Sequence, residues 1–125
     1  MDTAAAAHAW IDGWTRGWEN GDADAIGALY APDAVFRSHP FREPERSGRD
    51  YALRAFEDEE LVECRFGAPI VTGERAAVEY WAILRSEGED ETLAGIAVLR
   101  FRADGLVAEQ RDYWVMQPGR RPPLF

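Results

Sequence analysis

The chain has 125 residues, 46% of them hydrophobic and 12% aromatic, which is enough for one domain with a substantial core. Its formal net charge of −9 at pH 7 repels a nucleic-acid backbone and an anionic membrane surface, so neither is an expected partner. All 14 residues counted as Lys or Arg are arginine. The lack of lysine excludes Schiff-base chemistry on a lysine and a lysine general base.

The first part of the chain is predicted to be helical. Apolar residues recur at helical spacing within residues 3–20, Asp2 or Thr3 can cap the start, and Gly21 suits the end. The stripe includes Trp10, Trp14 and Trp18, which we interpret either as core or, for Trp14 above all, as the wall of a pocket. A short second helix follows Asp22, places Ile26, Leu29 and Tyr30 inward, and stops at Pro32.

The middle of the chain alternates between short elements and polar loops. Residues 34–37 form a predicted strand, and "SHPFREPERSG" after it is a loop. Ser47 begins a third helix with Tyr51, Leu53 and Phe56 along it. We interpret the acidic run 57–60 that closes this helix as a solvated connection.

From residue 61 onward the pattern is strand, turn, strand. The predicted strands cover 61–72, 75–85, 92–103 and 106–116, and "QPGRRPPLF" is an extended or partly disordered tail. Helices followed by a meander of long strands predict an α+β fold, with one domain at 1–117 and a tail at 118–125. Long strands curl, so helices on the concave side would leave a cone-shaped α+β barrel with a pocket at its open end.

The last hairpin determines where Asp112 points. A two-residue turn at Asp104-Gly105 would pair Ala97 with Asp112, Gly95 with Trp114, and Leu99 with Gln110. The small residues opposite Asp112 and Trp114 would leave empty volume on an apolar face. Asp112 is then either a hydrogen-bonded structural residue or a pocket acid whose pKa burial raises.

Several motifs resemble the nuclear transport factor 2-like superfamily, in particular its SnoaL-like polyketide cyclases and ketosteroid isomerases. They are "NGDADAIGALYAPDAVF", the helix start at Gly48, "GERAAVEYWAIL" and "RFRADGLVAEQRDYW", which together span nearly the whole chain. The resemblance implies three helices on a strongly curved, mostly antiparallel sheet. It also implies a homodimer formed through the convex sheet face, where Ala94, Ile96, Val98, Val107, Tyr113 and Val115 are expected.

The resemblance implies which of the reactions known in this superfamily the residues of this chain could support. Aligned through "NGDADAI", the tyrosine and two aspartates of ketosteroid isomerases fall on Trp14, Ser38 and Ala97, so that mechanism is not expected. Limonene-epoxide hydrolases need an Asp-Arg-Asp set with the Arg and one Asp two residues apart on a strand, and "GIAVLRFR" offers no such aspartate, so that chemistry is not expected either. The polyketide cyclase acid/base aspartate, in the pattern Gly-x-Ile-x-Glu-x-x-Asp, matches "GLVAEQRD" and so falls on Asp112.

Two further groups are candidate partners for Asp112. The same alignment turns Glu79, Trp81 and Ile83 inward, so that two acids would share one cavity and split their pKa values. In the alternative phase Glu79 meets solvent or a dimer partner, and the inward residues are Val78, Tyr80, Ala82 and Leu84.

The segment "SHPFR" is predicted to lie at the pocket rim. His39 either shuttles protons there or only caps a turn before Pro40, with Ser38 and Arg42 close by. The two histidines and the single cysteine form no zinc pattern, and we expect neither a metal nor a cofactor.

Two functional hypotheses follow. In the first, a small apolar carbonyl compound undergoes proton transfer in an isomerase, cyclase or lyase. Asp112 is then the acid/base, Glu79 or His39 its partner, and the pocket is shaped by Trp14, Ser38, Arg42, Trp81, Ala97, Gln110 and Trp114. In the second, the chain is a non-catalytic ligand-binding or dimerisation module. The single cysteine, Cys64, and the lack of a signal segment or membrane-spanning stretch favour the cytoplasm.

Overall fold

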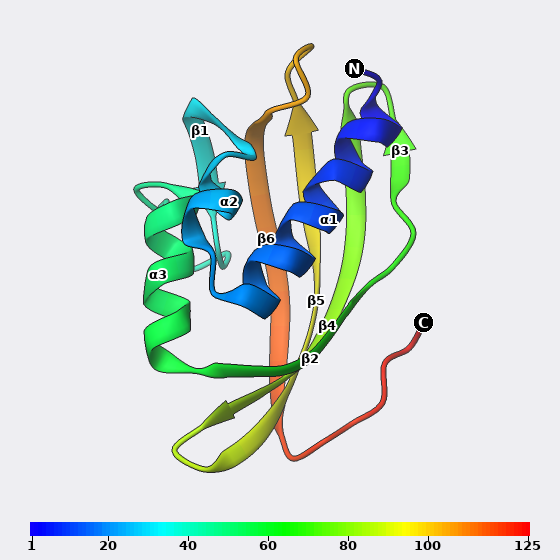
Figure 1. Cartoon of the computed structure of the whole chain (residues 1–125). Helices are drawn as coiled ribbons and strands as arrows, with labels where there is room; N and C mark the ends of the chain where they lie inside the picture. Colours follow the sequence, from blue (N-terminus) through cyan, green and yellow to red (C-terminus); the bar gives the residue numbers. More distant parts are fainter.

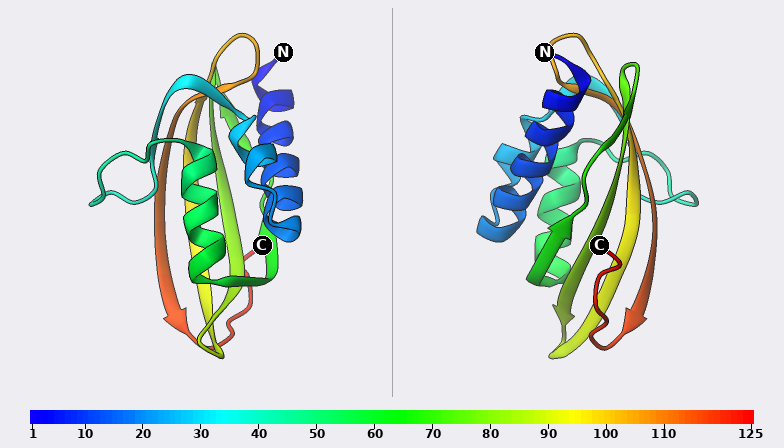
Figure 2. Two further views of the ribbon diagram at one scale, coloured as in Figure 1. Left: turned by 60° about the vertical axis from the view of Figure 1, so that its left-hand side comes forward. Right: turned by 90° about the vertical axis from the view of Figure 1, so that its right-hand side faces the viewer.

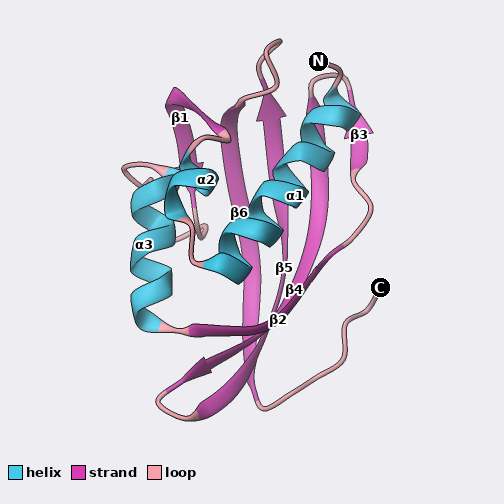
Figure 3. Ribbon diagram, viewed as in Figure 1, coloured by secondary structure: helices cyan, strands magenta, loops and turns pink.

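The computed structural model describes residues 1–125 and places three helices against one face of a six-stranded sheet (Figures 1 and 3). The elements in chain order are α1 (Thr3–Asn20), α2 (Ala23–Gly27), β1 (Tyr30–Arg37), α3 (Gly48–Asp58), β2 (Glu60–Phe66), β3 (Ile70–Thr72), β4 (Arg75–Ser86), β5 (Glu89–Phe101) and β6 (Val107–Pro118).

The sheet is curved, mixed and not closed. Its strand order is β1-β6-β5-β4-β2, with β3 also paired to β4, and only the β1–β6 pair is parallel. The helices cover the concave face, as the two side views in Figure 2 show. The predicted α+β cone with helices on a strongly curved, mostly antiparallel sheet is therefore confirmed.

Local capping explains the helix boundaries. The carboxylate of Asp2 accepts from the backbone N–H of Ala5 at 2.7 Å, and Asp22 and Ser47 cap α2 and α3 in the same way. Tyr30 differs from its prediction, because it begins β1 rather than ending α2. The predicted strand 61–72 is two strands, since the "GAP" segment interrupts the ladder and Pro69 has no N–H to donate.

The last hairpin has a different tip from the predicted two-residue turn. Its loop is residues 103–105: Arg102 N–H donates to the Leu106 carbonyl at 2.8 Å, and Gly105 N–H donates to the Arg102 carbonyl at 2.9 Å. Gly105 has φ of 87°, a left-handed conformation that favours glycine. A one-residue bulge at Ala108 then restores the predicted register, so Ala97 pairs with Asp112 and Gly95 with Trp114.

The bulge also changes which of the predicted residues lie on the convex face. On the hairpin-tip side of Ala108 the strand has slipped by one residue, which turns side chains to the opposite face. Val107 therefore lies in the core instead of on the convex face. Tyr113 and Val115, beyond the bulge, stay on the exposed face as expected.

The tail folds back along the sheet (Figure 1). The indole N–H of Trp81 donates to the Arg121 carbonyl at 2.8 Å, Arg121 N–H donates to the Thr92 hydroxyl at 2.8 Å, and Arg65 donates to the Phe125 carbonyl at 2.7 Å. Trp81 thus lies beneath the tail. None of the helices is both long and apolar enough to span a membrane.

Candidate functional site

A cavity of about 470 Å³ lies between the helices and the concave face of the sheet. This volume suits a small organic ligand. Twelve of its eighteen lining residues are hydrophobic, so an apolar compound fits it best. The walls are formed by Trp10, Trp14, Trp18, Arg42, Tyr51, Arg54, Ala55, Phe56, Asp58, Glu59, Phe66, Tyr80, Leu84, Leu93, Gln110, Asp112, Trp114 and Met116.

Asp112 is a buried acid in this cavity and has no cationic partner. It is 8% exposed and forms no ion pair. Its Oδ1 accepts a hydrogen bond from the side-chain amide of Gln110 at 2.9 Å. Burial raises the pKa of Asp112 from 3.8 to about 7, although hydrogen bonds from Gln110 and Tyr80 lower it in part. Asp112 is therefore poised to exchange a proton near neutral pH.

A chain of hydrogen bonds fixes the orientation of Gln110. The indole N–H of Trp14 donates to the Tyr30 hydroxyl at 2.9 Å, and that hydroxyl donates to Gln110 Oε1 at 2.5 Å. Trp10 also donates to Gln110 Oε1, at 3.2 Å. With its oxygen occupied as an acceptor, Gln110 must direct its NH₂ group toward Asp112.

Replacing Gln110 by leucine is expected to raise the pKa of Asp112 above 7, because the carboxylate loses its neighbouring donor. The check is an NMR titration of the Asp112 carboxyl carbon. Gln117→Leu is the matched control, since Gln117 is exposed on the same strand. An Asp112 pKa that is equal in both variants would contradict the role given to Gln110.

The mouth of the cavity carries four charged side chains: Arg42, Arg54, Asp58 and Glu59. Glu59 is partly buried, and burial followed by repulsion from Asp58 and Glu91 raises its pKa. The prediction that the acidic run 57–60 is a solvated connection is wrong for Glu59. Glu59 follows the end of α3 in an extended conformation and lines the cavity, a position that the run of acidic residues in the sequence did not indicate.

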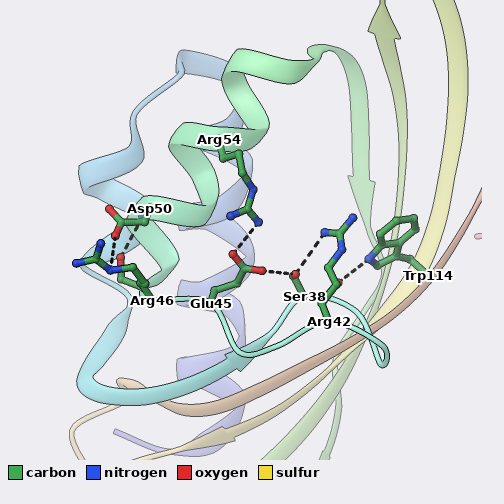
Figure 4. Close-up of polar contacts among 8 residues, drawn as sticks. Ser38, Arg42, Glu45, Arg46, Asp50, Arg54 and Trp114 are labelled. Carbon is green, nitrogen blue, oxygen red and sulfur yellow. Dashed lines mark hydrogen bonds and ion pairs between the residues drawn. The ribbon is translucent and has the colours of Figure 1, made fainter.

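A polar cluster supports one side of the mouth (Figure 4). Glu45 accepts from the Ser38 hydroxyl at 2.7 Å and pairs with Arg54 at 2.7 Å. Arg42 donates to the same hydroxyl at 3.4 Å. The indole N–H of Trp114 donates to the Ser38 carbonyl at 2.6 Å, which fixes this ring at the cavity wall. Ser38 is fully buried and supports the wall from behind.

The predicted inward orientation of Glu79 and Trp81 is wrong. Val78 and Tyr80 face the core, Glu79 is exposed, and Trp81 lies under the tail on the opposite face. The alternative phase of β4 is therefore the one observed. The expected empty volume opposite Trp114 is also absent, because a Cβ on Gly95 would lie 2.7 Å from Trp114 Cβ and 2.9 Å from the Tyr80 ring.

His39 lies beside the cavity but does not line it. Its Nδ1 accepts from the Phe41 backbone N–H at 3.2 Å, and its ring packs edge-on against Trp114 at 4.8 Å. This matches the turn-capping alternative. Ala97 is fully buried behind the wall, whereas Trp14, Arg42, Gln110 and Trp114 line the cavity with Asp112.

Two lining tyrosines were not singled out from the sequence as site residues. Burial and the nearby Asp112 raise the pKa of both Tyr51 and Tyr80, so both stay protonated at neutral pH. No protein group hydrogen-bonds to the Tyr51 hydroxyl. The inward position of Tyr51 on its helix was the available signal.

No three His, Cys, Asp or Glu side chains lie together in an arrangement that could hold a metal ion.

The model of the SnoaL-like domain family matches residues 9–110. This chain belongs to the SnoaL-like domain family. The match covers most of α1, the other two helices, the first five strands and the start of β6 as far as Gln110, and it ends two residues before Asp112. No curated protein matches the chain.

Solved structures with this SnoaL-like fold include enzymes and a binder. A Δ5-3-ketosteroid isomerase from Mycobacterium sp. is 19% identical, with a TM-score of 0.73 over 91% of this chain and 98% of the other. A putative polyketide cyclase from Xanthomonas campestris pv. campestris is 21% identical, with a TM-score of 0.69 and coverage of 91% and 93%. A computationally designed 17-OHP binder is 18% identical, with a TM-score of 0.72 and coverage of 91% and 98%. At these identities the likeness establishes the shared fold.

Proposed function

We propose that this SnoaL-like protein binds a small, mostly apolar carbonyl compound and catalyses proton transfer as an isomerase, cyclase or lyase, with Asp112 as the acid/base. The observation that carries the proposal is the Asp112 carboxyl, which is buried in a mostly apolar cavity, forms no ion pair and has a pKa of about 7. A general base is most effective when its pKa lies near the working pH. The isomerase and cyclase with the same fold support this class of reaction.

In the proposed reaction, the Asp112 carboxylate removes a proton from the carbon next to the substrate carbonyl. The C–H electron pair forms the carbon–carbon double bond of an enolate, and the π pair of the carbonyl moves onto its oxygen. The Tyr51 hydroxyl, protonated and free of protein partners, donates a hydrogen bond to that oxygen. Asp112, now a carboxylic acid, returns the proton at another carbon in an isomerase. In a cyclase the enolate carbon instead attacks a second carbonyl of the substrate, a carbon–carbon bond forms, and the new alkoxide takes the proton from Asp112.

The second acid of the cavity is Glu59, and not Glu79 as the sequence predicted. It shares the cavity with Asp112, and its pKa is also raised. We assign it the relay of protons between the cavity and solvent, since it lies at the mouth.

The test is deuterium uptake. The protein is incubated in D₂O with a pooled set of ketones and polyketide-like compounds, and mass spectrometry follows the carbon next to each carbonyl. Uptake or product formation above that of the buffer is expected. If no compound that binds the cavity exchanges faster than in buffer, the catalytic proposal fails.

A non-catalytic ligand-binding module is the second candidate. Its support is the lining of aromatic side chains and the position of His39 and Glu79 outside the cavity. The designed 17-OHP binder uses the same fold in this way. Ligand binding that is unchanged by Asp112→Asn, without any turnover, would favour this candidate.

The homodimer is also a proposal. Tyr113 and Val115 leave apolar surface exposed on the convex face, next to the strip covered by the tail. Sedimentation at micromolar concentration is expected to show a dimer, and Val115→Glu is expected to give monomer. A wild-type protein that sediments only as monomer would contradict this.

The single cysteine, Cys64, keeps the reducing cytoplasm as our predicted compartment.

A further inference from the structure

Arg42 is the cation at the cavity mouth that no carboxylate neutralises. The other arginine of the mouth, Arg54, pairs with Glu45 at 2.7 Å, whereas Arg42 forms no ion pair. In a chain with a net charge of −9, a lining arginine without an acidic partner is notable. Its positive charge nevertheless acts in the cavity, because it offsets part of the rise in the pKa of both Tyr51 and Glu59.

The Arg42 guanidinium packs against Trp114 and makes few hydrogen bonds within the protein. It lies over the Trp114 ring at 5.3 Å, and Trp114 is fixed by the Ser38 carbonyl. Its one hydrogen bond within the protein is the 3.4 Å contact with the Ser38 hydroxyl (Figure 4). A guanidinium has five N–H donors in a planar fork, which matches the two oxygens of a carboxylate. Most of these donors remain available here.

The other charges of the mouth restrict where an anion can bind. Asp58 and Glu59 lie at the end of α3 and would repel a negative group on that side. The interior is lined by aromatic and aliphatic residues and suits an uncharged body. An anionic group is therefore favourable only on the Arg42 side of the mouth.

The geometry points to a substrate whose apolar carbonyl-bearing body fills the cavity and whose carboxylate is bound by Arg42. This assignment of substrate class rests on the proposed function. It makes Arg42 a specificity-determining residue, with no part in the proton transfer itself.

The test compares two probes of similar shape, naphthalene-2-carboxylate and the neutral ketone 2-acetonaphthone, by titration calorimetry. The wild-type protein is expected to bind the carboxylate about fivefold more tightly, because an exposed charge-assisted contact contributes modestly. Arg42→Gln is expected to remove this preference and to leave the affinity for 2-acetonaphthone within about twofold, and Arg42→Lys is expected to restore part of it. Arg46→Gln is the control, since the Arg46 side chain is 92% exposed and pairs with Asp50 outside the cavity.

Two results would overturn the inference: equal affinity of the wild-type protein for both probes, or a carboxylate preference that survives Arg42→Gln. Either result leaves the proposed function standing, because 2-acetonaphthone would still occupy the cavity beside Asp112. Failure of both probes to bind would remove the cavity as a ligand site, and both proposals with it.

Discussion

Asp112→Asn is expected to lower the rate of proton transfer by about 10²–10⁴-fold, the usual contribution of a general acid/base. Asparagine has nearly the same shape and can still accept the hydrogen bond from Gln110, so the cavity should keep its form. It cannot take up a proton at neutral pH. The measurement is the initial rate of deuterium uptake or product formation at saturating ligand, with the ligand dissociation constant determined separately.

Asp12→Asn is the matched control for this experiment. It makes the same chemical change on the exposed side of α1, away from the cavity, and should leave the rate unchanged. A fall in rate confined to Asp112→Asn, with unchanged ligand affinity, identifies the lost step as proton transfer. Equal rates for Asp112→Asn and the wild-type protein would remove Asp112 from the mechanism.

The second large effect is on the free energy of unfolding. The pKa of Asp112 is about 7 in the folded protein against 3.8 as the ordinary value, so the native state binds this proton more tightly than the unfolded chain does. The contribution of this bound proton to the free energy of unfolding is fully present below about pH 4. It falls as the pH rises toward 7 and is lost above pH 7. Each pKa unit corresponds to about 1.4 kcal/mol, so ionising Asp112 costs the native state roughly 4 kcal/mol.

Asp112→Asn removes this dependence and should be more stable than the wild-type protein at alkaline pH. Between pH 5 and pH 8 the difference in unfolding free energy between the two proteins should widen by about 2–3 kcal/mol in favour of the variant. Urea unfolding at several pH values measures it, and Asp12→Asn should follow the wild-type curve. Parallel curves for Asp112→Asn and wild type would show that Asp112 is not held as a tightly protonated group.

Together these two predictions describe a residue that favours activity at the expense of stability. A substitution that stabilises the protein while abolishing turnover is expected where a site holds a group in an unfavourable state. A purely structural Asp112 would behave in the opposite way, because its loss would destabilise the fold.

The sequence carried enough information to place Asp112 but not its surroundings. Small and apolar residues alternate cleanly on β5, and the Arg100–Glu109 pair fixes its register with β6, so the Ala97–Asp112 pairing could be predicted. The bulge at Ala108 leaves no such periodic signal. Its effect is confined to the hairpin tip, where Val107 turns inward.

The phase of β4 could not be predicted for a physical reason. Residues 81–84 are all buried, because the tail covers part of the face opposite the cavity. A strand buried on both faces loses the alternation that distinguishes inside from outside. The prediction that turned Glu79 inward therefore turned Tyr80 outward. It placed an exposed acid in the cavity and a tyrosine of the cavity wall outside it.

The most direct test of the account is the titration of Asp112 itself in the wild-type protein. The NMR chemical shift of its carboxyl carbon, followed from pH 3 to pH 9, should show a midpoint near pH 7. A midpoint close to pH 4 would mean that water or a cation reaches this carboxyl, and Asp112 would then be an ordinary ionised residue without the proposed chemistry.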